Sequence, residues 1–213
     1  MTEFVFAIPG DITLATGGYG YDRRVMAEWR AAGHDVAHVV LPGGFPFPTS
    51  EDLAVSARRL GELPPARPVL IDGLALGAMP ADLLRGLRRP VVALVHHPLA
   101  LETGLDDEQR SALIASERAA LAEATAVVAT SASTARIVER DYGVAPGRVT
   151  VAEPGTDVRP STRGDGRGGG GGRPTRLLSV GAVIPRKAHG VLVDALARLS
   201  ELDWTCHIVG PLD

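Results

Sequence analysis

The chain has 213 residues, of which 45% are hydrophobic, and its formal net charge is −3. This apolar content can build a packed core, whereas the slightly acidic charge gives no overall basic field for nucleic acid. Cys206 is the only cysteine, which excludes an internal disulfide and a multi-cysteine zinc site. The first ten residues lack a signal-peptide pattern and no apolar run is long enough to span a bilayer, so we expect a cytoplasmic protein.

Short apolar runs alternate with helical patterns over the first 150 residues. Runs rich in Val and Ile predict strands at Phe4–Pro9, Val36–Leu41, Val69–Asp72, Val91–Val95, Ala126–Ala129 and Val149–Ala152. The segments between them predict helices at Tyr21–Ala32, Glu51–Leu60, Ala81–Leu87, Asp106–Ala124 and Ser131–Tyr142. Most of the strands are apolar throughout, which is typical of a parallel sheet buried on both faces. The alternation therefore predicts a doubly wound α/β fold.

The composition changes at residues 161–173, which read STRGDGRGGGGGR. Five consecutive glycines behave as flexible coil, so we interpret this segment as a linker or disordered loop. The alternation then restarts with a strand at Leu177–Val180, a helix at Gly190–Ser200 and a strand at Thr205–Val209. One βαβ unit is too small for an independent domain. We therefore expect a first domain over residues 1–160 and the beginning of a truncated second domain over residues 174–213.

The first candidate site is the glycine-rich loop after the first strand, which contains Gly17, Gly18 and Tyr19. Ligands bind open α/β sheets at the carboxyl ends of the strands, and glycines let the backbone approach them closely. A dinucleotide fingerprint would need a glycine where Arg23 stands, so NAD binding is not expected. An ordinary glycine-rich turn is the alternative.

Two histidines, His96 and His97, end the fourth predicted strand. Adjacent residues of an extended chain point in different directions and no third ligand has a recognisable spacing, so no metal site is expected. We expect instead that one histidine contacts a substrate and that the other is structural. The alternative is that both are ordinary polar residues of a loop. The hydroxyls of the segment Thr130–Thr134, which include those of Ser131 and Thr134, follow the fifth strand and could hold a sugar or phosphate. The alternative is that Ser131 or Ser133 simply caps the next helix.

A basic pair follows the first strand of the second domain. The strand ends in Gly181, and a short loop then presents Arg186 and Lys187 before a helix. A planar guanidinium and a compact ammonium together suit a diphosphate. A solvated basic loop is the alternative.

In this order, the motifs resemble the family 4 (group 1) GT-B glycosyltransferases. The resemblance rests on Thr16–Tyr19, the strand ending in His96, Ser131–Thr134, Glu153–Asp157 at the interdomain crossing, and Val180-Gly181 with Arg186-Lys187. It implies a GT-B-type Rossmann-like domain with a parallel sheet, which holds the acceptor, and a second Rossmann-like domain, incomplete here, which holds the nucleotide-sugar.

The resemblance also implies a retaining transfer, of the hexosyltransferase type, from a UDP- or GDP-linked donor. The acceptor would be a glycan, a lipid or a small molecule, and a peripheral membrane contact stays open. No metal cofactor is expected, because basic side chains and a helix N-terminus would stabilise the departing diphosphate.

The resemblance assigns roles to particular residues. Arg186 and Lys187, with Gly181, would bind the diphosphate, and His96, ahead of His97, would contact the transferred sugar. Gly17, Gly18 and Tyr19 would shape the loop against donor phosphate or acceptor. Ser131, Thr134 and Glu102 are further candidates for sugar or acceptor contacts.

The sequence also departs from the family pattern. The crossing reads Pro154-Gly155-Thr156-Asp157 instead of Pro-Asn-Gly-Val-Asp, and the Glu-x7-Glu segment of the family would lie beyond Asp213. We therefore expect this fragment to be inactive alone. One alternative is a sugar-nucleotide 2-epimerase or hydrolase, which needs acidic groups where the candidate loops offer only the unpaired Asp11 and Glu102. The other is a non-catalytic half that needs a partner chain.

Overall fold

The computed structural model describes residues 3–64, 67–158 and 174–211. The chain divides into two compact units, Met1–Gly155 and Thr156–Asp213. The boundary falls within the predicted crossing motif, Glu153–Asp157. The predicted glycine-rich linker, residues 161–173, lies outside the described residues.

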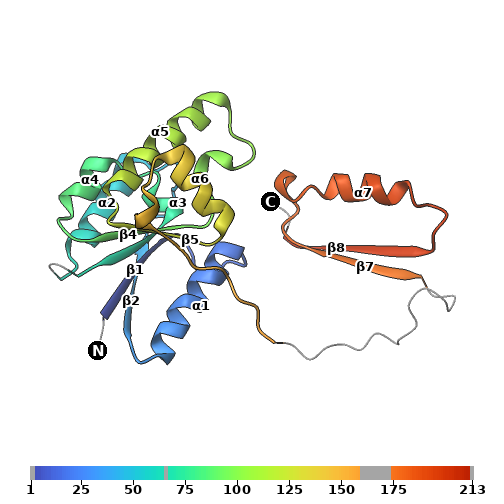
Figure 1. Ribbon diagram of the computed structural model, residues 1–213, viewed down its shortest axis with the longest axis horizontal. Coiled ribbons are helices and arrows are strands. Elements are labelled where there is room, and N and C mark those ends of the chain that lie inside the picture. Colours follow the sequence, from blue (N-terminus) through green and yellow to red (C-terminus); the bar gives the residue numbers. More distant parts are fainter. Residues whose placement is uncertain (1–2, 65–66, 159–173, 212–213) are drawn as a thin grey trace. The chain divides into compact units, whose positions relative to one another are not determined.

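The first unit is built on a six-stranded sheet in the order β2-β1-β3-β4-β5-β6 (Figure 1). Its strands are β1 (Glu3–Pro9), β2 (Asp35–Leu41), β3 (Val69–Asp72), β4 (Val91–Val95), β5 (Ala126–Ala129) and β6 (Val149–Val151). Every neighbouring pair is parallel. The predicted parallel α/β sheet is therefore confirmed, as is the Rossmann-like fold class.

Several helices of this unit begin or end at sequence signals that satisfy free backbone groups. They are α1 (Gly17–Ala31), α2 (Ser50–Gly61), α3 (Gly73–Leu76), α4 (Ala81–Gly86), α5 (Asp107–Glu123) and α6 (Ala132–Tyr142), with 3-10 turns η1 (Leu99–Leu101) and η2 (Pro146–Arg148). Capping boxes at Thr49 and Asp106 start α2 and α5. Gly143, in the left-handed conformation with φ 75°, ends α6.

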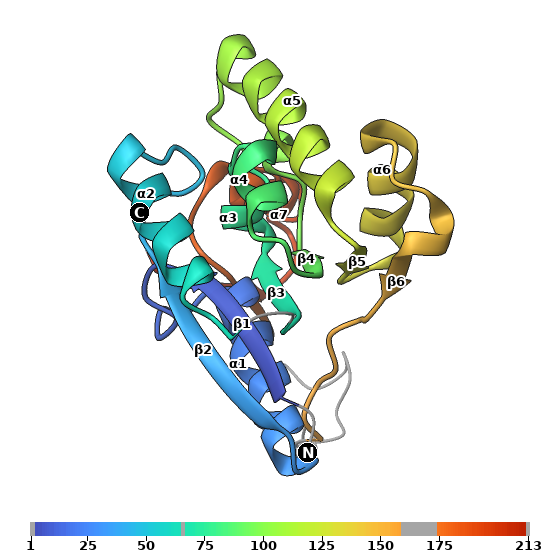
Figure 2. The ribbon, with the colours of Figure 1, turned by 90° about the vertical axis from the view of Figure 1, so that its left-hand side faces the viewer.

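Helices cover both faces of the sheet (Figures 1 and 2). On one face, Met26 and Trp29 of α1 pack against Phe6 and Ile8 of β1. The alternate residues of the same strands face α2 to α6, where they form the larger core. Both faces are apolar because both are buried, which explains the nearly continuous hydrophobic strands.

Two local features differ from the sequence-based expectation. Helix α1 begins at Gly17 rather than Tyr21, because the Thr16 hydroxyl caps it by accepting the Tyr19 N–H. Gly17, Gly18 and Tyr19, predicted to lie in a loop, therefore form the first helical turn. The short helix α3 was not expected, and the carboxylate of Asp72 caps it by accepting the Leu74 N–H at 2.8 Å.

The direction in which the chain winds through the sheet reverses beside β1. After β1 the chain crosses through α1 to β2 on one side, and it then returns through α2 to β3 on the other side. The connections that follow β1 and β3 consequently diverge, and open α/β sheets bind their ligands at such a point. The candidate loops of the first unit begin at this edge of the sheet.

The second unit contains a single βαβ motif. It consists of β7 (Thr175–Val180), the 3-10 turn η3 (Pro185–Lys187), α7 (His189–Ala197) and β8 (Trp204–Val209), and its two strands are parallel. Trp204 Nε1 donates to Leu199 O at 2.8 Å and fixes the turn before β8. In the described part of the chain, no helix combines the length and apolar character that a membrane crossing requires.

Candidate functional site

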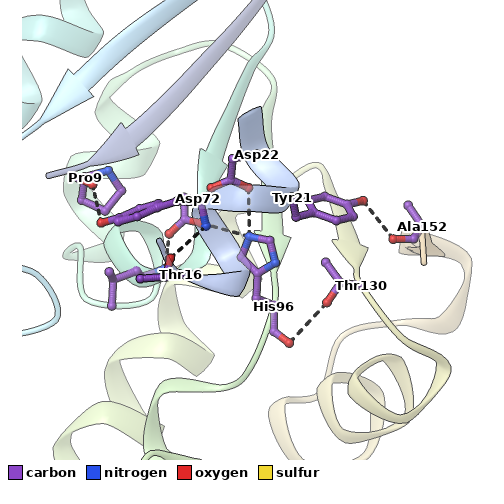
Figure 3. A network of polar contacts seen from close by, with 10 residues as sticks. Pro9, Thr16, Tyr21, Asp22, Asp72, His96, Thr130 and Ala152 are labelled. Atoms are coloured by element: carbon purple, nitrogen blue, oxygen red, sulfur yellow. Dashed lines mark hydrogen bonds and ion pairs between the residues drawn. The ribbon is translucent and has the colours of Figure 1, made fainter. Parts of the chain in front are cut away.

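Three segments bring polar side chains together at the carboxyl edge of the sheet (Figure 3). His96 directly follows β4, and Asp72 is the last residue of β3. Asp22 comes from the second turn of α1, one turn beyond Gly18, so both lie on the same face of that helix. The convergence follows from the topology, because β3 and β4 are neighbours and α1 crosses the sheet beside them.

One ring nitrogen of His96 faces both carboxylates. Its Nε2 lies 2.9 Å from Asp22 Oδ1 and 3.4 Å from Asp72 Oδ2. The side chain of Asp22 is fully buried, that of Asp72 is 4% exposed, and that of His96 is 23% exposed. The two carboxylates are thus shielded from solvent, and the imidazole is the more exposed part of the cluster.

The environment favours a charged imidazole. Burial alone would lower the pKa of His96, but the hydrogen bonds and negative charges of Asp22 and Asp72 outweigh it and raise this pKa to about 9. Burial raises the pKa of Asp22 in turn, against the opposing effect of its hydrogen bond with His96. At neutral pH His96 is therefore an imidazolium with a proton on each nitrogen.

Helix α1 supplies the surroundings of the ring. A Cβ on Gly18 would lie 3.5 Å from His96 Cδ2, so the bare helix backbone packs against that edge. The Tyr21 ring meets His96 edge-on at 5.2 Å between centroids, and its hydroxyl donates to Ala152 O at 2.9 Å. The Tyr19 hydroxyl donates to Pro9 O at 2.7 Å and ties α1 to the end of β1.

The backbone of His96 is held from the other side. The hydroxyls of Thr130 and Thr134 each lie 3.4 Å from His96 O and donate to it. Ser131 caps α6 by accepting the Thr134 N–H at 3.0 Å. Ser131 and Thr134, candidates for sugar contacts, thus also cap α6 and hold the strand end that carries His96.

A buried carboxylate secures the turn that follows the two histidines. Glu117 of α5 is 1% exposed, and its Oε2 accepts the Leu99 N–H at 3.0 Å. Burial raises the pKa of Glu117 to about 7, although hydrogen bonds from Tyr142 and from the Leu99 backbone oppose the rise. Gly77 leaves room for this contact, since a Cβ there would lie 2.8 Å from Leu99 Cδ1.

The remaining predicted residues lie apart from this cluster. His97 is exposed, and the Glu102 carboxylate accepts the adjacent Thr103 N–H at 3.2 Å. Gly17 has open space where a Cβ would stand.

In the second unit, Arg186 and Lys187 lie in η3 rather than in an irregular loop. The Lys187 methylenes pack over Gly181, where a Cβ would lie 3.8 Å from them. This packing brings the predicted diphosphate residues Gly181 and Lys187 together at the end of β7.

Sequence reasoning missed the two carboxylates. It found only unpaired acidic residues in the candidate loops, and this expectation is wrong for the site, because Asp22 and Asp72 pair on one histidine. Asp72 had a usable signal, since it is a charged residue at the end of an apolar strand next to the strand that ends in His96. Asp22 offered only its helical spacing from Gly18.

The cluster has the composition of a metal site. One ligand atom each from Asp22, Asp72 and His96 lie within 4.8 Å of one another. However, the 2.9 Å between Nε2 and Asp22 Oδ1 is an ordinary hydrogen-bond distance. The geometry therefore suits a shared proton.

Comparisons with known proteins find relatives of the segment that contains most of this site. The model of glycosyltransferase family 4 matches residues 55–159, which include Asp72, His96 and Glu117. This segment, just under half of the chain, is similar to glycosyltransferase family 4. The chain is 37% identical over 105 residues to a D-inositol 3-phosphate glycosyltransferase of Geodermatophilus obscurus. The match covers 47% of this chain but only 23% of that relative, so the chain corresponds to a part of it.

Solved structures show the same fold. A glycosyltransferase from Rickettsia africae superposes with a TM-score of 0.63 and 15% identity, over 98% of this chain and 60% of its own. The glycosyltransferase of kitacinnamycin gives a TM-score of 0.52 and 15% identity, over 97% of this chain and 65% of its own. These neighbours support the GT-B class for the fold of this chain.

Glu117 should make the stability of the first unit depend on pH. Its pKa is 4.5 in the unfolded chain and about 7 when folded, so the folded state binds more protons between these values. Stability from this group is therefore complete below pH 4.5 and is lost as pH rises through 7, by on the order of 3 kcal/mol. We expect Glu117→Gln to remove this loss, measured by urea unfolding from pH 4.5 to 8.

The matched control is Glu108→Gln, at an exposed position of the same helix. It should keep the wild-type pH dependence. Parallel stability curves for wild type and Glu117→Gln would contradict the assignment of a neutral, buried carboxyl group.

Proposed function

We propose that the chain is the acceptor-side domain, with the start of the donor-side domain, of a retaining glycosyltransferase that uses a UDP- or GDP-linked sugar. The observation that carries the proposal is the buried His96 cluster at the carboxyl edge of the sheet, of which His96 and Asp72 lie inside the segment matched by family 4. A cationic ring with one nitrogen turned toward solvent can donate a hydrogen bond to a substrate oxygen. The transferred sugar, of hexose type, is the substrate group we place there.

The departing diphosphate needs positive charge as its bond to the sugar breaks. Arg186 and Lys187 offer this charge together with the backbone at Gly181, and the pair precedes α7 in the chain. In this proposal the two basic side chains do the work of a metal ion, so no metal cofactor is needed.

The acceptor is proposed at the level of class only. The Geodermatophilus relative carries D-inositol 3-phosphate in its name, which is consistent with a small hydroxylated acceptor. A glycan or a lipid at a membrane surface is equally compatible with the site. We place the reaction in the cytoplasm, and we propose that the 213 residues alone are inactive because they contain no Glu-x7-Glu segment to hold the donor sugar.

The carboxylates give little support to an epimerase or hydrolase. Asp22 is fully buried and Asp72 is 4% exposed, so neither can reach a substrate carbon to exchange a proton. A non-catalytic half that meets a partner chain remains the second alternative, and activity of the complete protein would exclude it.

His96 should matter for turnover more than for donor binding. In a protein that includes the complete second domain, we expect His96→Ala to lower kcat about 100-fold, while the donor Kd changes less than about threefold. The measurement is steady-state transfer from UDP- and GDP-sugars, with donor binding by calorimetry. The exposed His97→Ala serves as the control and should retain nearly full kcat; the opposite ranking would move the site by one residue.

The basic pair should matter for donor binding. Charge-assisted hydrogen bonds contribute about 1.5–3 kcal/mol each, so Arg186→Ala with Lys187→Ala should weaken donor affinity at least about 100-fold. Arg176→Ala, an exposed arginine on β7, removes a charge from the same unit and should leave affinity unchanged. Equal affinities of the double variant and wild type would remove the diphosphate assignment.

A further inference from the structure

We propose that Asp22 is a positioning residue for His96: it accepts the Nε2 proton and thereby fixes the ring so that Nδ1 is the atom presented to substrate. The identity of that substrate rests on the proposed function. The orientation of the ring does not, because it follows from contacts within the first unit.

The Nε2 edge of His96 is closed to substrate. Asp22 Oδ1 and Asp72 Oδ2 lie 2.9 and 3.4 Å from Nε2, and the backbone at Gly18 covers the neighbouring Cδ2. The opposite edge carries Nδ1, which points away from both carboxylates (Figure 3). Among the contacts of the described residues, Nδ1 has no hydrogen-bond partner, and it is not one of the buried unpaired atoms. The 23% exposure of the side chain therefore leaves Nδ1 available to a ligand.

Asp22 is better placed than Asp72 to hold the ring. Its contact is the shorter one, and its side chain is fully buried. Asp72 has a second task, because its Oδ1 caps α3 through the Leu74 N–H. Among the described residues, Asp22 has no such helix-capping role, and its Oδ2 has no hydrogen-bond partner. A buried carboxylate with one unpaired oxygen costs stability, so a role in fixing His96 gives a reason for its presence.

The other groups that face His96 are uncharged, so the two carboxylates determine the protonation state of its ring. Helix α1 contributes Asp22 and the neutral phenols of Tyr19 and Tyr21, and β3 contributes Asp72. From the β5–α6 side, the described contacts are threonine hydroxyls on the backbone oxygen. With both carboxylates on the Nε2 side, Nδ1 keeps its proton through neutral pH and remains a donor to a substrate oxygen.

The test is an NMR titration of the imidazole nitrogens in the 213-residue chain, with His96 assigned through His96→Gln. In the wild type we expect both nitrogens protonated at pH 7 and a titration midpoint near the pKa of about 9. Asp22→Asn keeps the shape of the side chain but removes its charge. It should lower the pKa of His96 by at least about one unit.

The matched control is Glu28→Gln on the same helix. Glu28 pairs with Arg24 at 2.6 Å on the exposed face, so its loss should leave the His96 titration unchanged. Circular dichroism and the signals of the other histidines report whether Asp22→Asn is folded. If that variant does not fold, the wild-type titration still decides, since a midpoint near the ordinary value of about 6.5 would overturn the proposal.

Two further results would also overturn it. One is an unchanged His96 titration in folded Asp22→Asn. The other is a shift of the His96 signals by one equivalent of Zn²⁺ or Mn²⁺, which would show that the three side chains hold a cation rather than a proton.

Kinetics of the complete protein separate this inference from the proposed function. Asp22→Asn should lower kcat about tenfold, leave the donor KM unchanged and move the alkaline limb of the pH profile to lower pH. Unchanged kcat and pH profile would overturn the role toward substrate. A complete protein without transferase activity, but with the expected titration, would refute the proposed function and leave the positioning of His96 standing.

Discussion

The hydrogen bond between His96 Nε2 and Asp22 Oδ1 is the contact on which the arrangement of the site depends. Two carboxylates lie almost without solvent beside it, and burying such charges unpaired would cost several kcal/mol each. The imidazolium offsets that cost for both at once. In doing so it ties α1, β3 and β4 together at the edge of the sheet where open α/β folds bind their ligands.

The surrounding packing keeps these three elements at contact distance. Gly73 follows Asp72, and a Cβ there would lie 2.7 Å from Leu94 O, so a larger residue would push β3 away from β4. Gly18 lets the first turn of α1 rest directly on the His96 ring. Glu117 holds the turn after His97 through the Leu99 N–H. Two glycines and one buried carboxylate thus help to determine the position of the histidine.

Much of the fold could be predicted from the sequence, because the strands are apolar runs and the helices carry caps such as Asp106 and Gly143. The position of His96 at a strand end was predictable for the same reason. The start of α1 was not, since glycines at 17 and 18 indicate a loop until the cap at Thr16 is considered. Asp72, a charged residue at the end of an apolar strand, had a usable signal, but its pairing with His96 depends on which strands are neighbours. Asp22 could not be predicted, because its approach to His96 depends on how α1 packs on the sheet and no local pattern contains that information. The role of Arg186 and Lys187 in donor binding remains a prediction.

The site as a whole separates two tasks. The buried Nε2 side of His96 determines the charge and orientation of the ring, and the Nδ1 side is available to a ligand. Tyr21 links this ring to the segment beyond β6, because its hydroxyl donates to Ala152 O just before the boundary between the units.

The most direct test is a double-mutant cycle on kcat/KM in the complete protein, with Asp22→Asn, His96→Ala and both together. If Asp22 acts only through His96, the double variant should match His96→Ala within about twofold. Losses that multiply would contradict the account, because they would show that Asp22 contributes to the reaction independently of the histidine.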